Sequence, residues 1–217
     1  MPRRYGNRRR YRRRSGYNRY RGRSTNQIQN RQIYKLTRRV AAINQRTKAE
    51  KIYFPFSGGT TIGTTAAVVD FTAISSTDRV GLEIYSRKLY GSLYIDNNSA
   101  ALATTVRVAI VMDMQQVADT PLSFGDVFGS TSVMAQLNLT SPGRFKILWD
   151  RKISVTSQGN SRKMINLVVP IKKKIYYNGS ASTDIQRHGI YMFIWSDKAT
   201  NLPTYGYNIM HQYYDTS

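Results

Sequence analysis

Cysteine is absent from this sequence of 217 residues, and its absence excludes several kinds of chemistry. The chain has no disulfide framework, no thiolate nucleophile and no cysteine-based metal site, which agrees with folding in a reducing compartment. Long apolar runs are missing as well, and without one of about 18 residues we expect no helix that spans a membrane. The first residues also lack the apolar stretch of a secretory signal peptide.

Acidic residues are absent from residues 1–49, where fifteen arginines and two lysines give a net charge of +17. Residues 50–217 contain sixteen basic and twelve acidic side chains, a net charge of +4. Such an asymmetry is typical of a basic arm attached to a folded domain. We therefore predict three parts: an arm over residues 1–26, an amphipathic basic helix over residues 27–50 and a β domain over residues 51–217.

The arm combines arginine with tyrosine, and among residues 1–24 only Met1 has an aliphatic side chain. Such a segment cannot bury enough apolar surface to become ordered alone. Guanidinium groups bind phosphate through two parallel hydrogen bonds, and tyrosine rings offer faces on which unpaired bases stack, so we predict nucleic-acid binding. A nuclear-localisation tract or a solvated charge run is the alternative interpretation. The arginines predicted to bind nucleic acid are Arg3, Arg4, Arg8, Arg9, Arg10, Arg12, Arg13, Arg14, Arg19, Arg21 and Arg23.

Residues 27–50 have the apolar spacing of a helix and contain neither glycine nor proline. One narrow stripe is apolar, while Arg38 and Arg39 lie off it and add to the predicted nucleic-acid contacts. A stripe this narrow suits helices that associate with copies of themselves, and a helix laid on the surface of the chain's own β domain is equally compatible with it. The residues of the stripe, our predicted subunit-contact residues, are Ile33, Leu36, Val40 and Ile43.

From Lys51 onward the apolar period changes to two, and turn signals recur. Valine, isoleucine, tyrosine and threonine dominate, as they do in half-buried strands. Antiparallel strands with no long helices between them predict an all-β fold of two packed sheets, of which the jelly roll is the eight-stranded form. The eight predicted strands are 51–57, 66–74, 84–97, 104–113, 144–157, 163–177, 189–197 and 204–214.

The longest break between strands covers residues 114–143, and residues 120–130 within it predict a short helix. Thr120 is placed to cap this helix, because Pro121 suits the first helical position. The side chains expected to point inward are Leu122, Val127 and Phe128.

Two basic features lie inside the strand pattern. Alternation puts Lys172 and Lys174 on one face of a regular strand and Lys173 on the other, so they would not form one patch, and a solvated strand edge is the favoured interpretation. Arg107 occupies the middle of a strongly apolar strand. Since an isolated buried charge is costly, we expect it to reach solvent or a partner subunit.

Catalytic patterns are missing from the sequence. His188 and His211 both lie beside predicted strands, where a histidine is usually structural. Ser196 and Asp197 follow His188, but no elbow motif presents that serine as a nucleophile. Acidic residues are scattered without the rhythm of a calcium loop, and no glycine-rich phosphate loop is present. We therefore expect a protein that is not an enzyme and has no cofactor.

An ordered series of segments resembles one family. TRRVAAINQRTKAEKIYF at 37–54, SRKLYGSLYI at 86–95 and the block at 124–155, followed by MINLVVP and YYNG, are similar to segments of small single-jelly-roll viral capsid proteins, such as that of satellite tobacco necrosis virus. The opening MPRRYGNRRRYRRR looks more like the arms of capsid proteins from circular single-stranded DNA viruses that encode a replication initiator.

This resemblance implies a coat protein of a sixty-subunit icosahedral shell, found in the virion and, before assembly, in the host nucleus or cytoplasm. The jelly roll would form the wall, and the arm would bind a single-stranded genome, DNA rather than RNA by the likeness of the arm. The helix would gather in threes beneath the wall. The family also binds calcium between subunits near its C-terminus, where Asp215 is the candidate in this chain.

Two other function classes stay open. A host-type basic nucleic-acid-binding protein, ribosomal or chromatin-like, would explain the arm, but its β domain of +4 is poorly suited to lying on a polyanion. A lectin-like sandwich would explain the strands and give the arm no role. Sizing of the expressed chain separates these classes, because a coat protein forms uniform shells.

Overall fold

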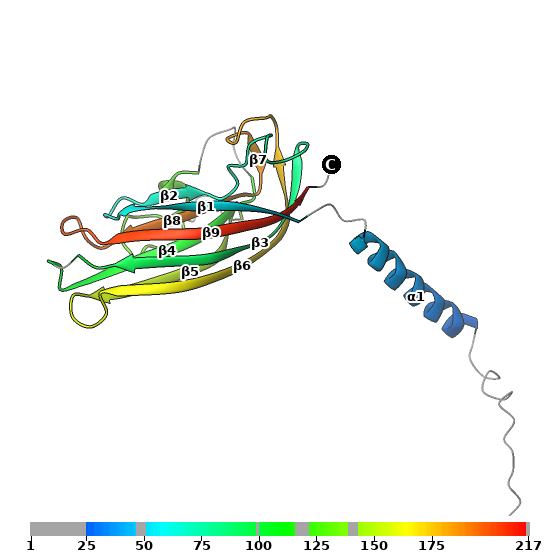
Figure 1. Cartoon of the computed structure of the whole chain (residues 1–217), viewed down its shortest axis with the longest axis horizontal. Helices are drawn as coiled ribbons and strands as arrows, with labels where there is room; N and C mark the ends of the chain where they lie inside the picture. The colour runs from blue at the N-terminus through cyan, green and yellow to red at the C-terminus, as the bar shows by residue number, and fades with distance from the viewer. Residues whose placement is uncertain (1–24, 47–50, 99, 116–121, 139–142, 216–217) are drawn as a thin grey trace, which may run out of the picture. The chain divides into compact units, whose positions relative to one another are not determined.

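The computed structural model divides the chain into two compact units, Met1–Lys48 and Ala49–Ser217, which we describe separately (Figure 1). No helix in the described part of the chain is long and apolar enough to span a membrane. The structure describes all residues except 1–24, 47–50, 99, 116–121, 139–142 and 216–217.

The described residues of the first unit form one helix, α1, over Thr25–Arg46. It begins two residues before the predicted segment, and residues 47–50 of that segment lie outside the described residues. Straight-chain residues and the absence of glycine and proline explain why these 22 residues are helical. Thr37 turns its hydroxyl back onto the Ile33 carbonyl oxygen, 2.9 Å away, as threonine often does within a helix.

The second unit is built from strands, and all eight predicted strands are present. The additional strand, β7, has three residues, too few for a period of two to be recognised. The strands are β1 Lys51–Thr61, β2 Ala67–Asp70, β3 Glu83–Asp96, β4 Ala103–Asp113, β5 Phe145–Thr156, β6 Arg162–Tyr177, β7 Ile185–Arg187, β8 Gly189–Ser196 and β9 Thr204–Asp215.

The strands form two antiparallel sheets with the topology of a jelly roll. One sheet has the order β1-β9-β3-β6-β7 and the other β2-β8-β4-β5, so the first and last strands of the unit lie side by side (Figure 1). Their register runs without a break from Lys51 opposite Tyr214 to Thr61 opposite Thr204. Two such four-stranded Greek-key sheets are what a jelly roll requires, and β7 extends one of them. The predicted fold class is confirmed.

The main core lies between the two sheets and follows the predicted alternation. On β4, Val106, Val108, Ile110 and Met112 are buried in it, and Leu89 on β3 belongs to the same cluster. Full burial of one such side chain stabilises the fold by about 1.5–3 kcal/mol. These positions therefore account for much of the driving force for closing the sandwich.

A second apolar cluster covers the other face of β4 and β8. Ala109 and Val111 on β4 and Trp195 on β8 alternate with the residues of the main core and pack against the segment after β4. This segment contains a short helix, α2, over Phe124–Val127. The three predicted inward-pointing residues belong to the cluster, which confirms that prediction; they are Leu122, Val127 and Phe128.

The start of α2 differs from the prediction. Its N-cap is Ser123, whose hydroxyl accepts a hydrogen bond from the Asp126 backbone, while the Asp126 carboxylate accepts one from the Ser123 backbone. This reciprocal capping box satisfies two backbone donors of the first turn. Thr120, the predicted cap, lies outside the described residues.

Arg107 finds its partners within its own chain, so the expected contact with solvent or another subunit is wrong. The side chain forms two hydrogen bonds to Asp150, at 2.9 and 2.7 Å, and a third to the Ala135 carbonyl at 2.5 Å. Its guanidinium carbon lies 5.0 Å from the Phe128 ring centroid and 5.2 Å from that of Trp195. The charge is therefore paired beneath the segment that covers β4.

Candidate nucleic-acid interface

The eleven arginines predicted to bind nucleic acid in the arm, from Arg3 to Arg23, lie outside the described residues. Their role stays a prediction from the sequence. The two further candidates, Arg38 and Arg39, lie on α1 with exposed side chains. Arg38 places its guanidinium carbon 5.5 Å from the centroid of the Tyr34 ring. This cation–π contact repeats within the helix the pairing of arginine with tyrosine that characterises the arm.

The apolar stripe is formed as the spacing predicts, on one face of α1. Residues three and four apart are neighbours on a helix, which brings Ile33, Leu36 and Val40 together. Their side chains are 60%, 58% and 53% exposed. Ile43 lies in the helix, but its side chain is outside the described part of the chain. The stripe thus presents apolar surface without burying it.

His211 has a structural environment. It is fully buried, its Nδ1–H donates to the Phe71 carbonyl at 2.9 Å, and its Nε2 accepts from the Ser86 hydroxyl at 2.6 Å. Burial lowers the pKa of His211 to about 4, so the ring is neutral at pH 7. Both ring nitrogens are engaged and no solvent reaches them. His211 therefore joins β9, β3 and the end of β2 rather than offering a base to a substrate.

His188 and Ser196 have separate partners. The Nδ1–H of His188 donates to the Lys174 carbonyl at 2.5 Å, and burial lowers the pKa of this half-buried ring. The Ser196 hydroxyl donates to the Ile62 carbonyl at 3.0 Å, while Asp197 accepts the backbone N–H of Thr105. The structure places these groups in backbone contacts, as structural residues would be.

Asp215, the calcium candidate of the family resemblance, is buried at the end of β9. Its carboxylate accepts the backbone N–H of Val80. Among the described residues, no three His, Cys, Asp or Glu side chains come together as a metal site would require. Calcium binding between subunits stays a prediction.

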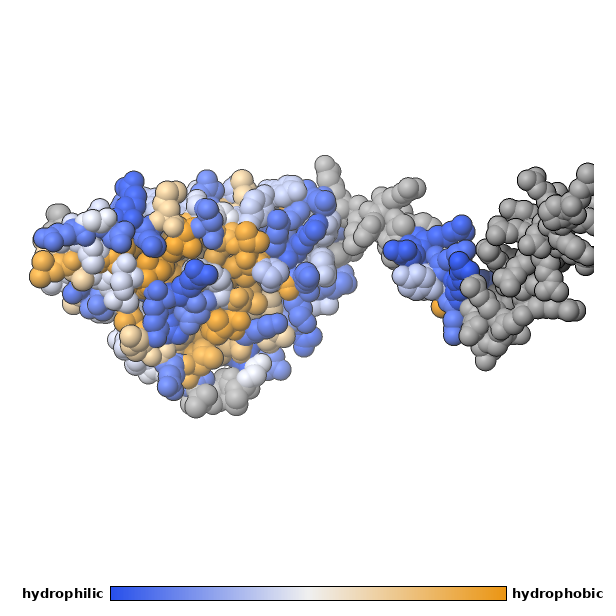
Figure 2. Space-filling view, turned by 90° about the horizontal axis from the view of Figure 1, so that it is seen from below, coloured by the Kyte–Doolittle hydropathy of each residue, from blue (hydrophilic) through white to orange (hydrophobic). Residues whose placement is uncertain are grey.

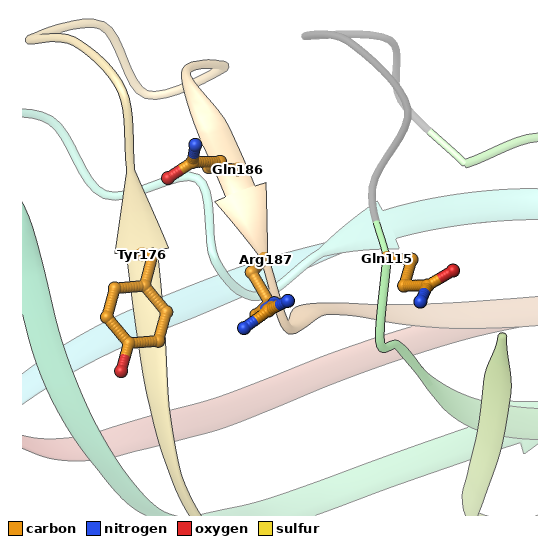
Figure 3. Close-up of a pocket in the computed structure, with 4 residues that line it drawn as sticks. All are labelled: Gln115, Tyr176, Gln186 and Arg187. Carbon is orange, nitrogen blue, oxygen red and sulfur yellow. The ribbon is translucent and has the colours of Figure 1, made fainter.

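One polar hollow of about 590 Å³ lies on the β unit. Tyr176 comes from β6, Gln186 and Arg187 come from β7, and Gln115 follows β4 (Figure 3). In the described part of the chain, Arg187 has no acidic partner within 4.0 Å. The hollow combines a guanidinium, two amides and a phenol, a set that hydrogen-bonds to phosphate and to the polar edges of bases.

Several solved structures from viruses are similar to this chain. That of desmodium yellow mottle tymovirus has a TM-score of 0.37 and 16% identity, covering 79% of this chain and 91% of its own. The 60-mer of the BFDV capsid protein has a TM-score of 0.34 and 10% identity, covering 77% and 93%. The structure of turnip yellow mosaic virus has a TM-score of 0.31 and 12% identity, and the match covers 78% of this chain and 97% of the other. No protein-family model and no curated protein matches the sequence.

Sequence reasoning did not find the polar hollow. Gln186 and Arg187 fall between two predicted strands, 163–177 and 189–197, where the pattern indicated only a connection. The available signal was the sequence Gln-Arg-His directly before a buried strand. This sequence indicates a site only together with the pairing of β7 with the end of β6, which places Arg187 opposite Tyr176.

Proposed function

We propose that this chain is a viral coat protein that assembles into a small icosahedral shell of sixty copies and packages a single-stranded genome through its arginine-rich arm. The proposal rests on one observation, that a strongly basic segment and a jelly-roll unit of low net charge occur in the same chain. Residues 1–49 have a net charge of +17, and they precede a jelly-roll unit whose sequence has a net charge of +4. A polycation suited to phosphate is thereby attached to a sandwich suited to forming a wall.

The chemistry of the arm supports a single strand as the ligand. Charge neutralisation by arginine supplies affinity for any nucleic acid, and the tyrosines supply stacking faces that require unpaired bases. The resemblance of the arm favours DNA over RNA. An arm of this composition also serves as a nuclear-localisation tract before assembly.

The exposed stripe on α1 supports self-association. Ile33, Leu36 and Val40 form an apolar seam about one side chain wide, the geometry by which helices pair with copies of themselves. Arg38 and Arg39 lie beside the seam and carry charge that remains available to the genome. A helix bundle below the wall would thus join subunits and bind nucleic acid at the same place.

The surface of the β unit also supports assembly. Figure 2 shows hydrophobic side chains gathered on one face between hydrophilic ones. Large side chains that are more than half exposed in this unit include Met164 and Val168 on β6, each at 67%. Extensive exposed apolar surface is typical of proteins whose surfaces are covered by partners. In a shell, neighbouring copies would provide that cover.

A salt titration on a labelled single strand tests the role of the arm. Log affinity should fall linearly with log salt, and neutralising six arginines should flatten the slope by up to about four units, since each phosphate contact on a single strand contributes about 0.7. Lysine at the same positions should keep most of the slope and lose affinity through fewer bidentate and stacking contacts. The positions to be replaced are Arg8, Arg9, Arg10, Arg12, Arg13 and Arg14. An unchanged slope in the alanine variant would contradict the proposal.

A further inference from the structure

The register of the five-stranded sheet gathers tyrosines and cations at one of its ends. Lys51 pairs with Tyr214, Tyr214 with Tyr85, and Tyr85 with Lys174, which forms one row across β1, β9, β3 and β6. Beside this row, Arg187 on β7 pairs with Tyr176 on β6. Figure 1 shows the start of β1, the end of β9 and β7 at the same end of the sandwich.

These side chains lie on the face of the sheet that points away from the core. Ile84, Ile175 and Tyr213, which precede or follow them along the strands, are buried in the main core. Because successive residues of a strand point to opposite faces, Tyr85 and Tyr214 point outward. Both tyrosines keep part of their surface exposed, and their ring centroids are 6.3 Å apart.

A bulge adds one further cation at this end. The pairing of β3 with β9 and β6 shifts between Ser86 and Lys88, and Arg87 between them is exposed. Arg87 donates a hydrogen bond to the Tyr214 hydroxyl at 3.0 Å, which holds its guanidinium over the outer face.

The three lysines of β6 are exposed, as expected for a solvated strand edge. Lys172, Lys173 and Lys174 precede the two residues of β6 that pair with β7, Tyr176 and Tyr177, so this stretch lies at the edge of its sheet. Lys172 has a positive φ of 55° beside the bulge.

Most of these cations are available to a ligand. Lys174 is paired with Glu83 at 2.7 Å, so it adds little net charge. Within the described residues, Lys51, Arg87 and Arg187 have no acidic partner within 4.0 Å. Covering unpaired cations with an uncharged partner is costly, because they lose their hydration and gain no opposite charge. This surface therefore favours a ligand that carries negative charge.

We propose that this surface is a second binding site for single-stranded nucleic acid, located on the β unit itself. We name it the tyrosine–cation face and define it as Lys51, Tyr85, Arg87, Tyr176, Arg187 and Tyr214. The inference rests on the proposed function in one respect, that the strand bound here is the strand bound by the arm. Lys51 is the first residue of β1, so the face includes the end of the β unit at which this strand begins.

The chemistry of the face matches a single strand in two ways. Its guanidinium and ammonium groups suit phosphates, and its partly exposed tyrosine rings suit unstacked bases. The polar hollow is part of the face, since Tyr176 and Arg187 line it together with Gln115 and Gln186. Its volume of about 590 Å³ lies in the range of small-molecule pockets and admits one nucleotide. The amides would bind the base edge while Arg187 binds a phosphate.

Charge variants of the full-length chain test the phosphate contacts. Arg87→Ala combined with Arg187→Ala should flatten the salt dependence of binding to an oligothymidine by about 1.4 units, twice the contribution of one single-strand phosphate contact. The control is Arg151→Ala combined with Lys163→Ala, which removes the same charge from exposed positions outside the face and should leave the slope nearly unchanged. Equal slopes for the two double variants would overturn the inference.

Ring variants distinguish a nucleic acid from a base-free polyanion such as a sulfated polysaccharide. Tyr85→Leu combined with Tyr176→Leu should weaken oligothymidine binding by about fivefold or more per ring and leave binding of an abasic strand unchanged, while the corresponding phenylalanine variant should bind like the original. If the leucine variant binds both strands like the original, the assignment to nucleic acid is overturned. The six-arginine arm variant is titrated in parallel so that failure of this inference can be distinguished from failure of the proposed function. If the arm variant flattens the salt dependence and the variants of the tyrosine–cation face do not, only the second binding site is refuted.

Discussion

His211 is buried and Asp70 is partly buried, and their pKa values are shifted in opposite directions. Replacing Asp70 should therefore reveal the effect of His211 on stability. Burial lowers the pKa of His211 to about 4 from an unfolded value of 6.5. Burial also raises the pKa of Asp70, at the end of β2, to about 6 from 3.8, although hydrogen bonds from Thr72 oppose this shift. A difference of one pKa unit corresponds to 1.36 kcal/mol, so each group couples folding to pH by about 3 kcal/mol.

The two effects have opposite signs. As the pH falls from 6.5 to 4, the unfolded chain protonates His211 while the folded chain does not, so the free energy of unfolding decreases by about 3 kcal/mol. As the pH falls from 6 to 3.8, the folded chain protonates Asp70 while the unfolded chain does not, so the free energy of unfolding increases by at most about 3 kcal/mol. Together the two groups should leave stability nearly constant across this range.

Asp70→Asn removes the second effect and keeps the geometry. The oxygen that accepts from the Thr72 backbone N–H at 2.7 Å and from its hydroxyl at 2.6 Å is retained in asparagine. Urea unfolding of the unassembled subunit, followed at several pH values between 6.5 and 4, should then show a loss of about 3 kcal/mol that the original chain does not show. Asp78→Asn, at an exposed carboxylate, is the control and should behave like the original chain. A flat profile for Asp70→Asn would refute the assignment of His211 as a neutral buried ring.

Three further substitutions, one of them with a matched control, test the packing and the stripe. Arg107→Ala should lower the free energy of unfolding by about 2–3 kcal/mol in urea titrations, because the buried Val133 and Ala135 carbonyls lose the donor that they share. Gly91→Ala should cost about 3 kcal/mol, because the added Cβ would lie 2.7 Å from the Ile209 Cα of β9, whereas Gly125→Ala, with no atom within 4 Å, should change the melting temperature little. Leu36→Asp should reduce assembly in light scattering while leaving the melting temperature of the isolated subunit unchanged, and a large drop in that temperature would indicate that α1 packs on its own β unit.

Much of the β unit could be predicted because its strands are long and strongly alternating. Val106, Val108, Ile110 and Met112 stand two residues apart, and the structure buries all four on one face of β4. The sheet order could not be predicted from this pattern, since alternation carries no information on which strand pairs with which. Only the register shows that β1 lies beside β9.

The features that escaped prediction depend on single residues or on contacts far apart in the chain. The partner of Arg107, Asp150, is 43 positions away and is reached only when β4 pairs with β5. The positive φ of Lys172, beside the bulge between β3 and β6, could not be inferred from its side chain. The polar hollow joins residues of three separate segments, so no local motif indicates it.

Purification of particles from cells that express the chain is the most direct test of the central claim. The account predicts shells of uniform small diameter in negative stain, containing a single strand that survives nuclease treatment. Sixty copies of residues 1–49, each at +17, provide about a thousand positive charges, which matches a protected strand on the order of one to a few kilobases. Deleting residues 1–24 should remove the protected strand. Monomers at low salt, or shells that protect no nucleic acid with the arm intact, would contradict the account.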